Sequence, residues 1–397
     1  MTAPAGTGET TADRVRAHLA AIAGAPRPAG GAAEAAARAH CAATLRALGF
    51  RVRELPFAYS ALPGRYGTPL AGLVLAGALA AAGHAGYRWR QPGLALGVLA
   101  AALALLAAGG TWLTRRGVLD APMARAGSVN LEAVRGAEEP RVWLVAHLDS
   151  KSQPVPMALR VGGVVASALA LVAAATVAAL QLAGSADAAR WWPAVTVVGI
   201  LATLPVVATT VGARSPGALD DASGVATVLA AAALLPPGVP VGVLLPSAEE
   251  LGLAGARAWS GARRADGRGA GIALNVDGVD DGGVLTAMWS RRTPPVDALI
   301  AALTEGAAAA RAPFRDRRLV PGILTDHVAL ADAGWTTLTL SRGTWRTLSR
   351  IHTARDSLDA LDGAGAVEAA RVLASAVARL VEAPPHAAPP PLPTGPS

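Results

Sequence analysis

Four long stretches of this chain contain no aspartate, glutamate, lysine or arginine. A helix needs about 20 mainly apolar residues to cross a bilayer, and the buried helices of soluble proteins are usually shorter. Tyrosine and tryptophan residues lie at the ends of these stretches, as in the aromatic belts of membrane proteins. The pattern therefore predicts four membrane-spanning helices. Their limits are Tyr66–Tyr87, Gln91–Thr114, Val161–Ala186 and Trp191–Ala213, with 22, 24, 26 and 23 residues.

The composition agrees with this prediction. Of the 397 residues, 52% are hydrophobic, and the mean hydropathy of +0.40 is high for a soluble enzyme. The net charge of +7 comes from scattered arginines without a basic helix or an aromatic platform, so we expect no nucleic-acid partner. The single cysteine, Cys41, excludes an intramolecular disulfide and a Cys-x-x-Cys metal site. A lone lysine, Lys151, beside many arginines, alanines and glycines suggests a GC-rich bacterial genome.

The four spans form two hairpins, at residues 66–114 and 161–213, and each hairpin returns to the side from which it left. Basic residues set the orientation, because they are enriched on the cytoplasmic side. Three lie at the hairpin tips, namely Arg88, Arg90 and Arg190. Seven lie near the opposite ends, namely Arg65, Arg115, Arg116, Arg125, Lys151, Arg160 and Arg214. Met1–Asp13 has no signal-peptide pattern. We therefore expect a multi-pass protein of the bacterial cell membrane with a cytoplasmic globular domain.

The remaining segments, residues 12–65, 115–160 and 214–383, alternate between strand and helix patterns. Residues 384–397 are rich in proline and are predicted to be a disordered tail. The expected strands are 51–57, 128–134, 140–146, 239–245, 271–276, 284–288 and 336–340. The expected helices are 13–23, 32–48, 223–235, 251–264, 296–311, 326–333 and 364–383. This alternation predicts an α/β domain with a mainly parallel sheet sandwiched by helices and interrupted by the two transmembrane hairpins.

Five short fragments carry side chains that bind metal ions. They are His147-Leu148-Asp149, Asp220-Asp221-Ala222-Ser223-Gly224, Glu249-Glu250, Asn275-Val276-Asp277 and Ile351-His352-Thr353. Three of them follow the expected strands 140–146, 239–245 and 271–276. Functional groups of open α/β sheets gather at the carboxyl ends of parallel strands. The fragments are therefore expected to meet in one site.

The residue types suit a pair of divalent ions about 3.5–4 Å apart, which needs histidine and carboxylate ligands and one bridging carboxylate. His147 and His352 supply imidazoles, Glu250 and Asp277 supply carboxylates, and Asp220 can bridge the two ions. Asp149 can hold the other nitrogen of the His147 ring. Since Glu249 and Glu250 point in different directions, one can bind metal while the other accepts a proton from the attacking water.

Together the fragments resemble the zinc-dependent co-catalytic aminopeptidases, which include bacterial leucyl and Streptomyces-type aminopeptidases, with glutamate carboxypeptidases as relatives. The resemblance begins at Ser128 and omits the second hairpin. It implies two Zn²⁺ ions, although other divalent ions suit the same ligands. It also implies a cis peptide bond between Asp220 and Asp221, and Thr325-Asp326-His327 is similar to a loop that lines the family's site.

The resemblance assigns a role to each site residue. His147, Asp220 and Asp277 would hold one zinc ion, and Asp220, Glu250 and His352 the other. Glu249 would be the general base, and Asp149 would orient His147. One departure from the family is that 70 residues, including the second hairpin, separate Asp149 from Asp220. Another is the absence of a signal peptide, because most relatives are secreted.

The favoured function is a membrane-anchored dinuclear zinc aminopeptidase that acts on the N-terminus of a peptide or protein. Three alternatives remain: a glutaminyl-cyclase-like acyltransferase, suggested by His147-Leu148-Asp149-Ser150-Lys151, a carboxypeptidase-like hydrolase, and a non-catalytic membrane scaffold with a peptidase fold. The second hairpin leaves just after Asp149 and returns just before Asp220, so its roots should lie on the rim of the site. We therefore expect a cleft close to the bilayer that favours apolar or membrane-associated peptides. The sequence leaves side-chain preference and oligomeric state open.

Overall fold

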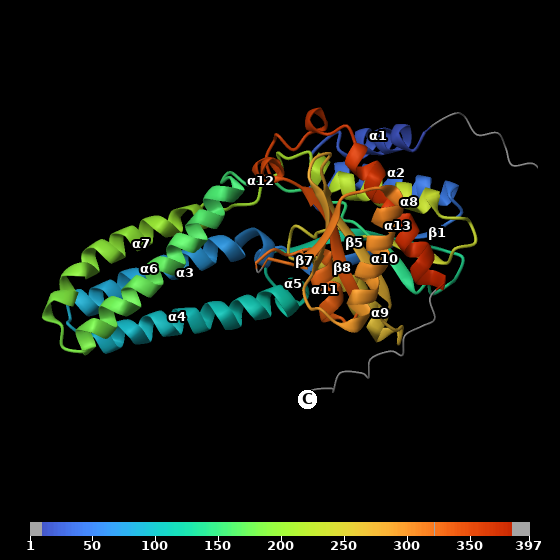
Figure 1. Cartoon of the computed structure of the whole chain (residues 1–397). Coiled ribbons are helices and arrows are strands. Elements are labelled where there is room, and N and C mark those ends of the chain that lie inside the picture. Colours follow the sequence, from blue (N-terminus) through green and yellow to red (C-terminus); the bar gives the residue numbers. More distant parts are fainter. Residues whose placement is uncertain (1–9, 321, 383–397) are drawn as a thin grey trace, which may run out of the picture.

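A bundle of four long helices projects from one side of an α/β domain (Figure 1). The computed structural model describes residues 10–320 and 322–382, so the predicted tail at 384–397 lies outside the described residues. The bundle consists of α3 (Leu62–Tyr87), α4 (Pro92–Trp112), α6 (Met157–Leu182) and α7 (Trp192–Val207). Four helical spans, Leu62–Tyr87, Pro92–Asp120, Met157–Leu182 and Ala186–Val207, are long and apolar enough to cross a membrane, judged by length and composition. The last one includes the short helix Ala186–Trp191 that precedes α7.

The α/β domain is built on one eight-stranded sheet with the order β1-β2-β4-β3-β5-β8-β6-β7. The strands are β1 (Arg51–Ser60), β2 (Arg125–Arg135), β3 (Val142–Val145), β4 (Val241–Leu245), β5 (Ile272–Val279), β6 (Val284–Trp289), β7 (Phe314–Arg318) and β8 (Thr336–Gly343). The helices outside the bundle are α1 (Thr11–Ile22), α2 (Ala32–Ala47), α5 (Val118–Asp120), α8 (Ser223–Leu234), α9 (Ala254–Ala265), α10 (Pro294–Ala310), α11 (Asp326–Asp332), α12 (Trp345–Arg350) and α13 (Ala364–Glu382).

The sheet is mixed, so the prediction of a mainly parallel sheet holds only for its centre. Strands β4, β3, β5 and β8 run parallel to one another. The pairs β1–β2, β2–β4 and β6–β8 are antiparallel, and the edge strand β7 is parallel to β6. An antiparallel edge on a parallel centre is common because only the central strands need cover on both faces. The charged sequence of the edge strand β7, Phe314–Arg318, explains why the sequence pattern missed it.

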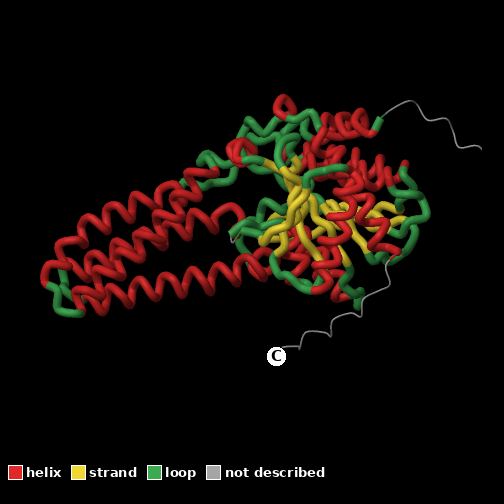
Figure 2. Tube along the Cα trace, viewed as in Figure 1, coloured by secondary structure: helices red, strands yellow, loops and turns green. Residues whose placement is uncertain are grey.

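Helices cover both faces of this sheet (Figure 2). Every residue of β3 is buried, and its side chains alternate between two cores. Leu144 belongs to the large core beneath α8 and α13, whereas Trp143 packs on the opposite face with Trp259 and Trp335. Burial on both faces fixes the central strands and therefore the sheet edge that carries the predicted site.

The bundle has its small residues inside and large apolar side chains outside. Leu169 and Val198, for example, are 64% and 63% exposed. Helices α3 and α7 approach closely where a Cβ atom on Gly83 would lie 2.1 Å from Thr196 Oγ1. Near the bundle tip, Gln181 accepts a hydrogen bond from the Trp192 indole and donates one to the Gly86 carbonyl. Small residues at close helix crossings are typical of helices that pack in a lipid environment.

Replacing Gly83 with alanine should destabilise the bundle by about 1–3 kcal/mol, because the new methyl group overpacks the α3–α7 contact. Gly77 on the same helix is the matched control, since nothing lies within 4 Å of a Cβ atom there. Gly77→Ala should be neutral or stabilising by about 0.5–1 kcal/mol through helix propensity. Thermal unfolding in detergent compares the two variants, and equal melting temperatures would contradict this packing.

Candidate metal centre

The structure brings all five predicted ligands together at the carboxyl edge of the central strands. His147 follows β3, and Glu249 and Glu250 follow β4. Asp277 was expected to follow a strand, but it lies inside β5, which extends to Val279. Asp220 comes just before α8, and His352 follows α12. Parallel strands and one helix start thus deliver side chains from distant parts of the chain to one place.

Asp220 lies at the centre of this arrangement. Its Oδ1 atom is 3.1 Å from His147 Nε2, and its Oδ2 atom is 3.0 Å from His352 Nε2. The two oxygens of one carboxylate thus face two different imidazoles. The peptide bond between Asp220 and Asp221 is cis, as the family resemblance implied. This geometry is what a carboxylate bridging two ions requires.

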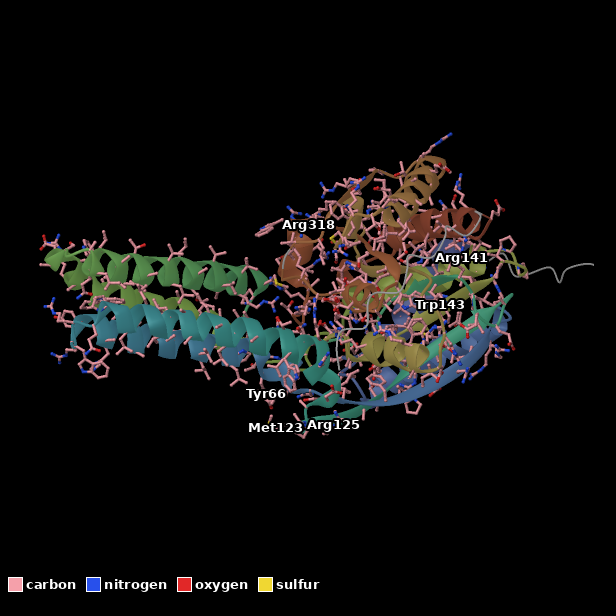
Figure 3. The ribbon with its side chains drawn as sticks, turned by 90° about the horizontal axis from the view of Figure 1, so that it is seen from below. Tyr66, Met123, Arg125, Arg141, Trp143 and Arg318 are labelled. Atoms are coloured by element: carbon pink, nitrogen blue, oxygen red, sulfur yellow. The ribbon has the colours of Figure 1, made fainter. Side chains whose placement is uncertain are left out.

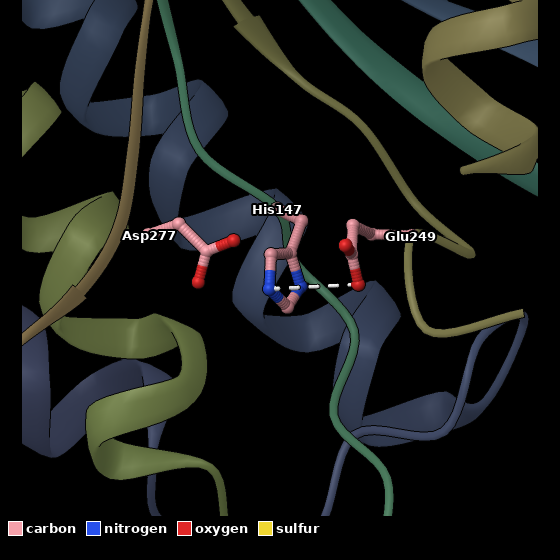
Figure 4. A group of neighbouring side chains, drawn as sticks. All are labelled: His147, Glu249 and Asp277. Carbon is pink, nitrogen blue, oxygen red and sulfur yellow. Dashed lines mark ion pairs between the residues drawn. The ribbon is translucent and has the colours of Figure 1, made fainter. Parts of the chain in front are cut away.

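Two groups of possible ligands surround Asp220. One consists of His147, Glu249 and Asp277, and the other of Asp220, Glu250 and His352, with the ligand atoms of each group within 4.8 Å of one another. Figure 4 shows the first group, in which His147 Nε2 lies 3.9 Å from Glu249 Oε2. The first group contains Glu249 where the family pattern has Asp220. Asp220 Oδ1 lies 3.1 Å from His147 Nε2, closer than Glu249 Oε2 at 3.9 Å. Both carboxylates therefore lie near the His147 imidazole.

Asp149 acts on the site through contacts that the sequence did not predict. Nδ1 of His147 lies 3.0 Å from the Asp149 carbonyl oxygen and 3.6 Å from its carboxylate. The backbone carbonyl therefore orients the ring and leaves Nε2 free for a metal ion. The Asp149 carboxylate instead accepts hydrogen bonds from the backbone N–H groups of Glu249 and Glu250, at 3.0 and 3.3 Å. The Asp149 carboxylate thus joins the loop after β3 to the loop after β4.

Two further buried aspartates support the ligands and were not singled out from the sequence. Asp221 accepts hydrogen bonds from the backbone N–H groups of His147 and Gly278, at 3.2 and 3.0 Å. Asp356 accepts hydrogen bonds from the backbone N–H groups of Leu219 and Asp220, at 2.6 and 3.2 Å. Burial raises the pKa of Asp356 to about 7. Asp221 follows Asp220 in the sequence, and Asp356 comes shortly after His352. This proximity to predicted ligands was the only signal that could have identified the two aspartates.

The second hairpin does not disturb the site, because its two roots are paired. Ser152 and Gly212 exchange backbone hydrogen bonds of 2.9 and 2.8 Å, forming an isolated antiparallel bridge. The guanidinium of the buried Arg27 donates hydrogen bonds to the carbonyls of Leu148 and Gly217, at 2.8 and 3.0 Å. The 70-residue insertion between Asp149 and Asp220 therefore begins and ends in two segments that are hydrogen-bonded to each other. The ligands keep a tight local geometry despite their separation in sequence.

Lys151 forms a buried ion pair with a predicted ligand. Its Nζ atom lies 2.5 Å from Glu250 Oε2. Burial alone would raise the pKa of Glu250, but the charges of Lys151 and His352 bring it down to about 2. The other oxygen, Oε1, is 3.3 Å from His352 Nε2 and accepts no hydrogen bond from the described residues. Lys151 thus occupies one oxygen of Glu250 and leaves the other directed at the site.

The electrostatics of the site favour a bound cation. Burial raises the pKa of Asp277 to about 7, and the Asp220 carboxylate adds to the rise. Burial likewise raises the pKa of Glu249 well above its ordinary value. Several carboxylates in low dielectric repel one another unless a positive charge compensates them. Within the described residues, Glu250 Oε1 is a buried acceptor without a donor, so the donor set fits divalent metal ions.

Comparison with known proteins supports this interpretation of the site. Residues 195–377 match the sequence model of peptidase family M28. The predicted resemblance to zinc aminopeptidases is thereby confirmed, as is the prediction of a metallopeptidase of the aminopeptidase type. The matched segment contains Asp220, Glu249, Glu250, Asp277 and His352, whereas His147 precedes it.

Solved structures share this fold at low sequence identity. An aminopeptidase from Aneurinibacillus sp. strain AM-1 is 15% identical, with a TM-score of 0.54 and coverage of 93% of both chains. A zinc aminopeptidase from Bacillus subtilis is 16% identical, with a TM-score of 0.54 and coverage of 93% of this chain and 95% of the other. A glutaminyl cyclase from Porphyromonas gingivalis is 15% identical, with a TM-score of 0.54 and coverage of 93% and 98%. No curated protein sequence matches the chain. The fold alone therefore does not separate peptidase from cyclase.

Replacing Lys151 with methionine should destabilise the α/β domain by about 3–5 kcal/mol, because it leaves the buried Glu250 carboxylate without its cation. Arg379→Met is the matched control, since Arg379 pairs with Glu305 at 2.8 Å on the exposed surface. The control should change stability by less than about 1 kcal/mol. Chemical denaturation of the metal-free proteins measures the free energy of unfolding of both variants. A similar loss of stability in the two would show that the Lys151–Glu250 pair is not buried in solution.

Proposed function

We propose that the chain is a membrane-anchored dinuclear zinc aminopeptidase. The observation that carries the proposal is the position of Asp220, whose two carboxylate oxygens face His147 and His352 at 3.1 and 3.0 Å. In the proposed centre His147, Asp220 and Asp277 hold one ion, and Asp220, Glu250 and His352 hold the other. The zinc aminopeptidases with the same fold support the choice of metal.

Bound zinc ions would polarise the substrate carbonyl and lower the pKa of water at the site toward about 7. Glu249 then acts as the general base. Its Oε2 lies 3.9 Å from His147 Nε2, so the carboxylate faces the centre without needing to bind an ion. Glu249 accepts a proton from the attacking water and passes it to the leaving amine. The Asp149 hydrogen bond to the Glu249 backbone holds this carboxylate in place.

The surplus of buried acid favours the amino end of a peptide over the carboxyl end. Asp326, at the start of α11, is buried, and neither of its carboxylate oxygens has a hydrogen-bond partner among the described residues. Burial, together with the nearby Asp149 and Asp277 carboxylates, raises the pKa of Asp326 to about 7. A positively charged α-amine relieves such a surplus, whereas a substrate carboxylate adds to it. We therefore favour an aminopeptidase over a carboxypeptidase.

A glutaminyl-cyclase-like acyltransferase is the second candidate. The observations that favour it are Lys151, directly after the His147–Ser150 segment, and the cyclases among the structural neighbours. The two reactions give different products from a peptide that begins with glutamine. An aminopeptidase releases free glutamine, whereas a cyclase releases ammonia and leaves the peptide otherwise intact. Mass spectrometry of one such peptide separates the two candidates.

Residues 66–114 and 161–213 form the transmembrane hairpins of the proposed enzyme, and residues 12–65, 115–160 and 214–383 form its peptidase domain. Arginines near the domain ends of the hairpins outnumber those at the tips, which supports a cytoplasmic peptidase domain. The second hairpin begins directly behind the His147 loop, at the Ser152–Gly212 bridge. The site therefore lies close to the membrane surface and favours apolar or membrane-associated peptides.

The test of catalysis is hydrolysis of aminoacyl-nitroanilides by the detergent-purified chain. Glu249→Gln should lower kcat by about 10²–10⁴-fold, because it removes the general base and keeps the shape of the side chain. The variant should still bind two zinc ions per chain, measured by elemental analysis. Loss of one ion together with activity would instead make Glu249 a ligand, as its place in the first group allows.

Zinc should stabilise the protein as well as activate it. A ligand at 100 times its dissociation constant adds about 2.7 kcal/mol to the free energy of unfolding. Chelation should therefore lower the melting temperature, and zinc should restore it. Asp220→Asn should reduce this response, because the variant loses the charge shared by both ions. An unchanged melting temperature after metal removal, verified by elemental analysis, would contradict a structural contribution of the ions.

A further inference from the structure

The α/β domain exposes few large apolar side chains, and their positions are not random. Outside the four bundle helices and the turns at their tips, the described residues with such side chains are Met123, Leu234, Val320, Ile323, Leu324, Trp345 and Leu348. All except Leu234 lie at three places in the chain, which we together call the apolar rim. They are Met123, then Val320 with Ile323 and Leu324, and finally Trp345 with Leu348. Trp345, on α12, is 73% exposed, more than any other large apolar side chain in the described chain. Clustered exposure of this kind marks an interaction surface.

All three segments lie on the side of the domain from which the bundle projects. Figure 3 labels Met123 beside the base of the bundle and Arg318, which precedes the Val320–Leu324 segment, at the same end of the domain. Helix α12 contacts α6 and lies near its first turn (Figure 1). Arg141 and Trp143 lie farther from the bundle in Figure 3. The apolar rim therefore continues the apolar surface of the bundle onto the domain.

Basic side chains accompany the apolar rim. Arg125, Arg318 and Arg346 are exposed and lie next to its three segments in the sequence. Tryptophan and arginine together are typical of the zone between lipid headgroups and acyl chains. Each arginine near an anionic membrane surface contributes about 1 kcal/mol to binding. Both the charge and the apolar surface thus complement a bilayer that contains anionic lipids.

The apolar rim also borders the metal centre. Helix α12 ends at Arg350, two residues before His352, and the Val320–Leu324 segment directly precedes Thr325 and the buried Asp326. From these positions we infer that the rim inserts into the headgroup region of the bilayer and holds the mouth of the site against it. The inference rests on the proposed membrane anchoring. With the rim in the headgroup region, the site would act on substrates whose amino end emerges from the membrane surface.

Site-specific fluorescence tests this contact in the full chain. The native Cys41 is buried, so a cysteine introduced at Trp345 provides a single reactive site for an environment-sensitive label. The protein is placed in nanodiscs of phosphatidylcholine and phosphatidylglycerol that contain a nitroxide lipid. Labels at Leu169→Cys, on the outer face of α6, and at Glu138→Cys, an exposed position between β2 and β3, are the positive and negative controls.

A label at Trp345→Cys should show blue-shifted emission and strong nitroxide quenching, close to those of Leu169→Cys, whereas Glu138→Cys should show neither. If the Leu169 label is quenched and the Trp345 label behaves like that of Glu138, the rim does not touch the bilayer, although the anchoring stands. If the Leu169 label is not quenched either, the membrane anchoring itself fails. Emission of the Trp345 label that shifts only with protein concentration in detergent would identify a second copy of the chain as the occupant and overturn the inference.

Discussion

The burial of several carboxylates around Asp220 is the constraint on which the rest of the domain depends. Asp220, Glu250 and Asp277 lie within one small volume together with the supporting Asp149 and Asp221. Their mutual repulsion in low dielectric is large unless cations compensate it. Backbone N–H groups, Lys151 and two imidazoles compensate part of this charge, and in the proposed centre divalent metal ions would compensate the remainder. The fold therefore has to hold every loop of the site rigidly.

That rigidity comes from hydrogen bonds between loops rather than within them. Asp149 holds the Glu249-Glu250 loop, Asp221 holds the His147 and Gly278 backbones, and Arg27 joins the two roots of the second hairpin. Each of these buried groups has several partners, as buried polar groups require. The same network explains how a hairpin of two long helices can be inserted between two site residues. The insertion begins beyond the Ser152–Gly212 bridge, so it adds length without moving the ligands.

The fold of the α/β domain and the four-helix bundle meet on one side of the molecule. Zinc aminopeptidases are among the structural neighbours that share the fold, and this chain carries four helical spans of suitable length and hydropathy for a membrane. Both hairpins join the domain on one side, next to α12 and at the end of the domain that carries Arg318. In the proposed enzyme the sheet edge would carry the chemistry, and the hairpins and rim would select the substrates that reach it.

The sequence by itself determined the features that depend on local pattern. Uncharged runs marked the four apolar helices, alternating strand and helix patterns marked the α/β domain, and three of the five ligand fragments followed expected strands. Charged edge strands such as Phe314–Arg318 were missed, because an exposed strand needs no apolar pattern. The antiparallel edges of the sheet were likewise missed, since strand direction depends on pairing between distant segments.

Only the tertiary structure decided how the ligands are supported. The sequence could not show that the Asp149 carbonyl orients His147 while its carboxylate holds Glu249, or that Lys151 pairs with Glu250. These contacts join residues up to about a hundred positions apart in the chain. Their formation depends on where the strands place the loops in space. Spacing in the sequence identifies which groups can bind a metal, whereas packing of the sheet determines which groups orient them.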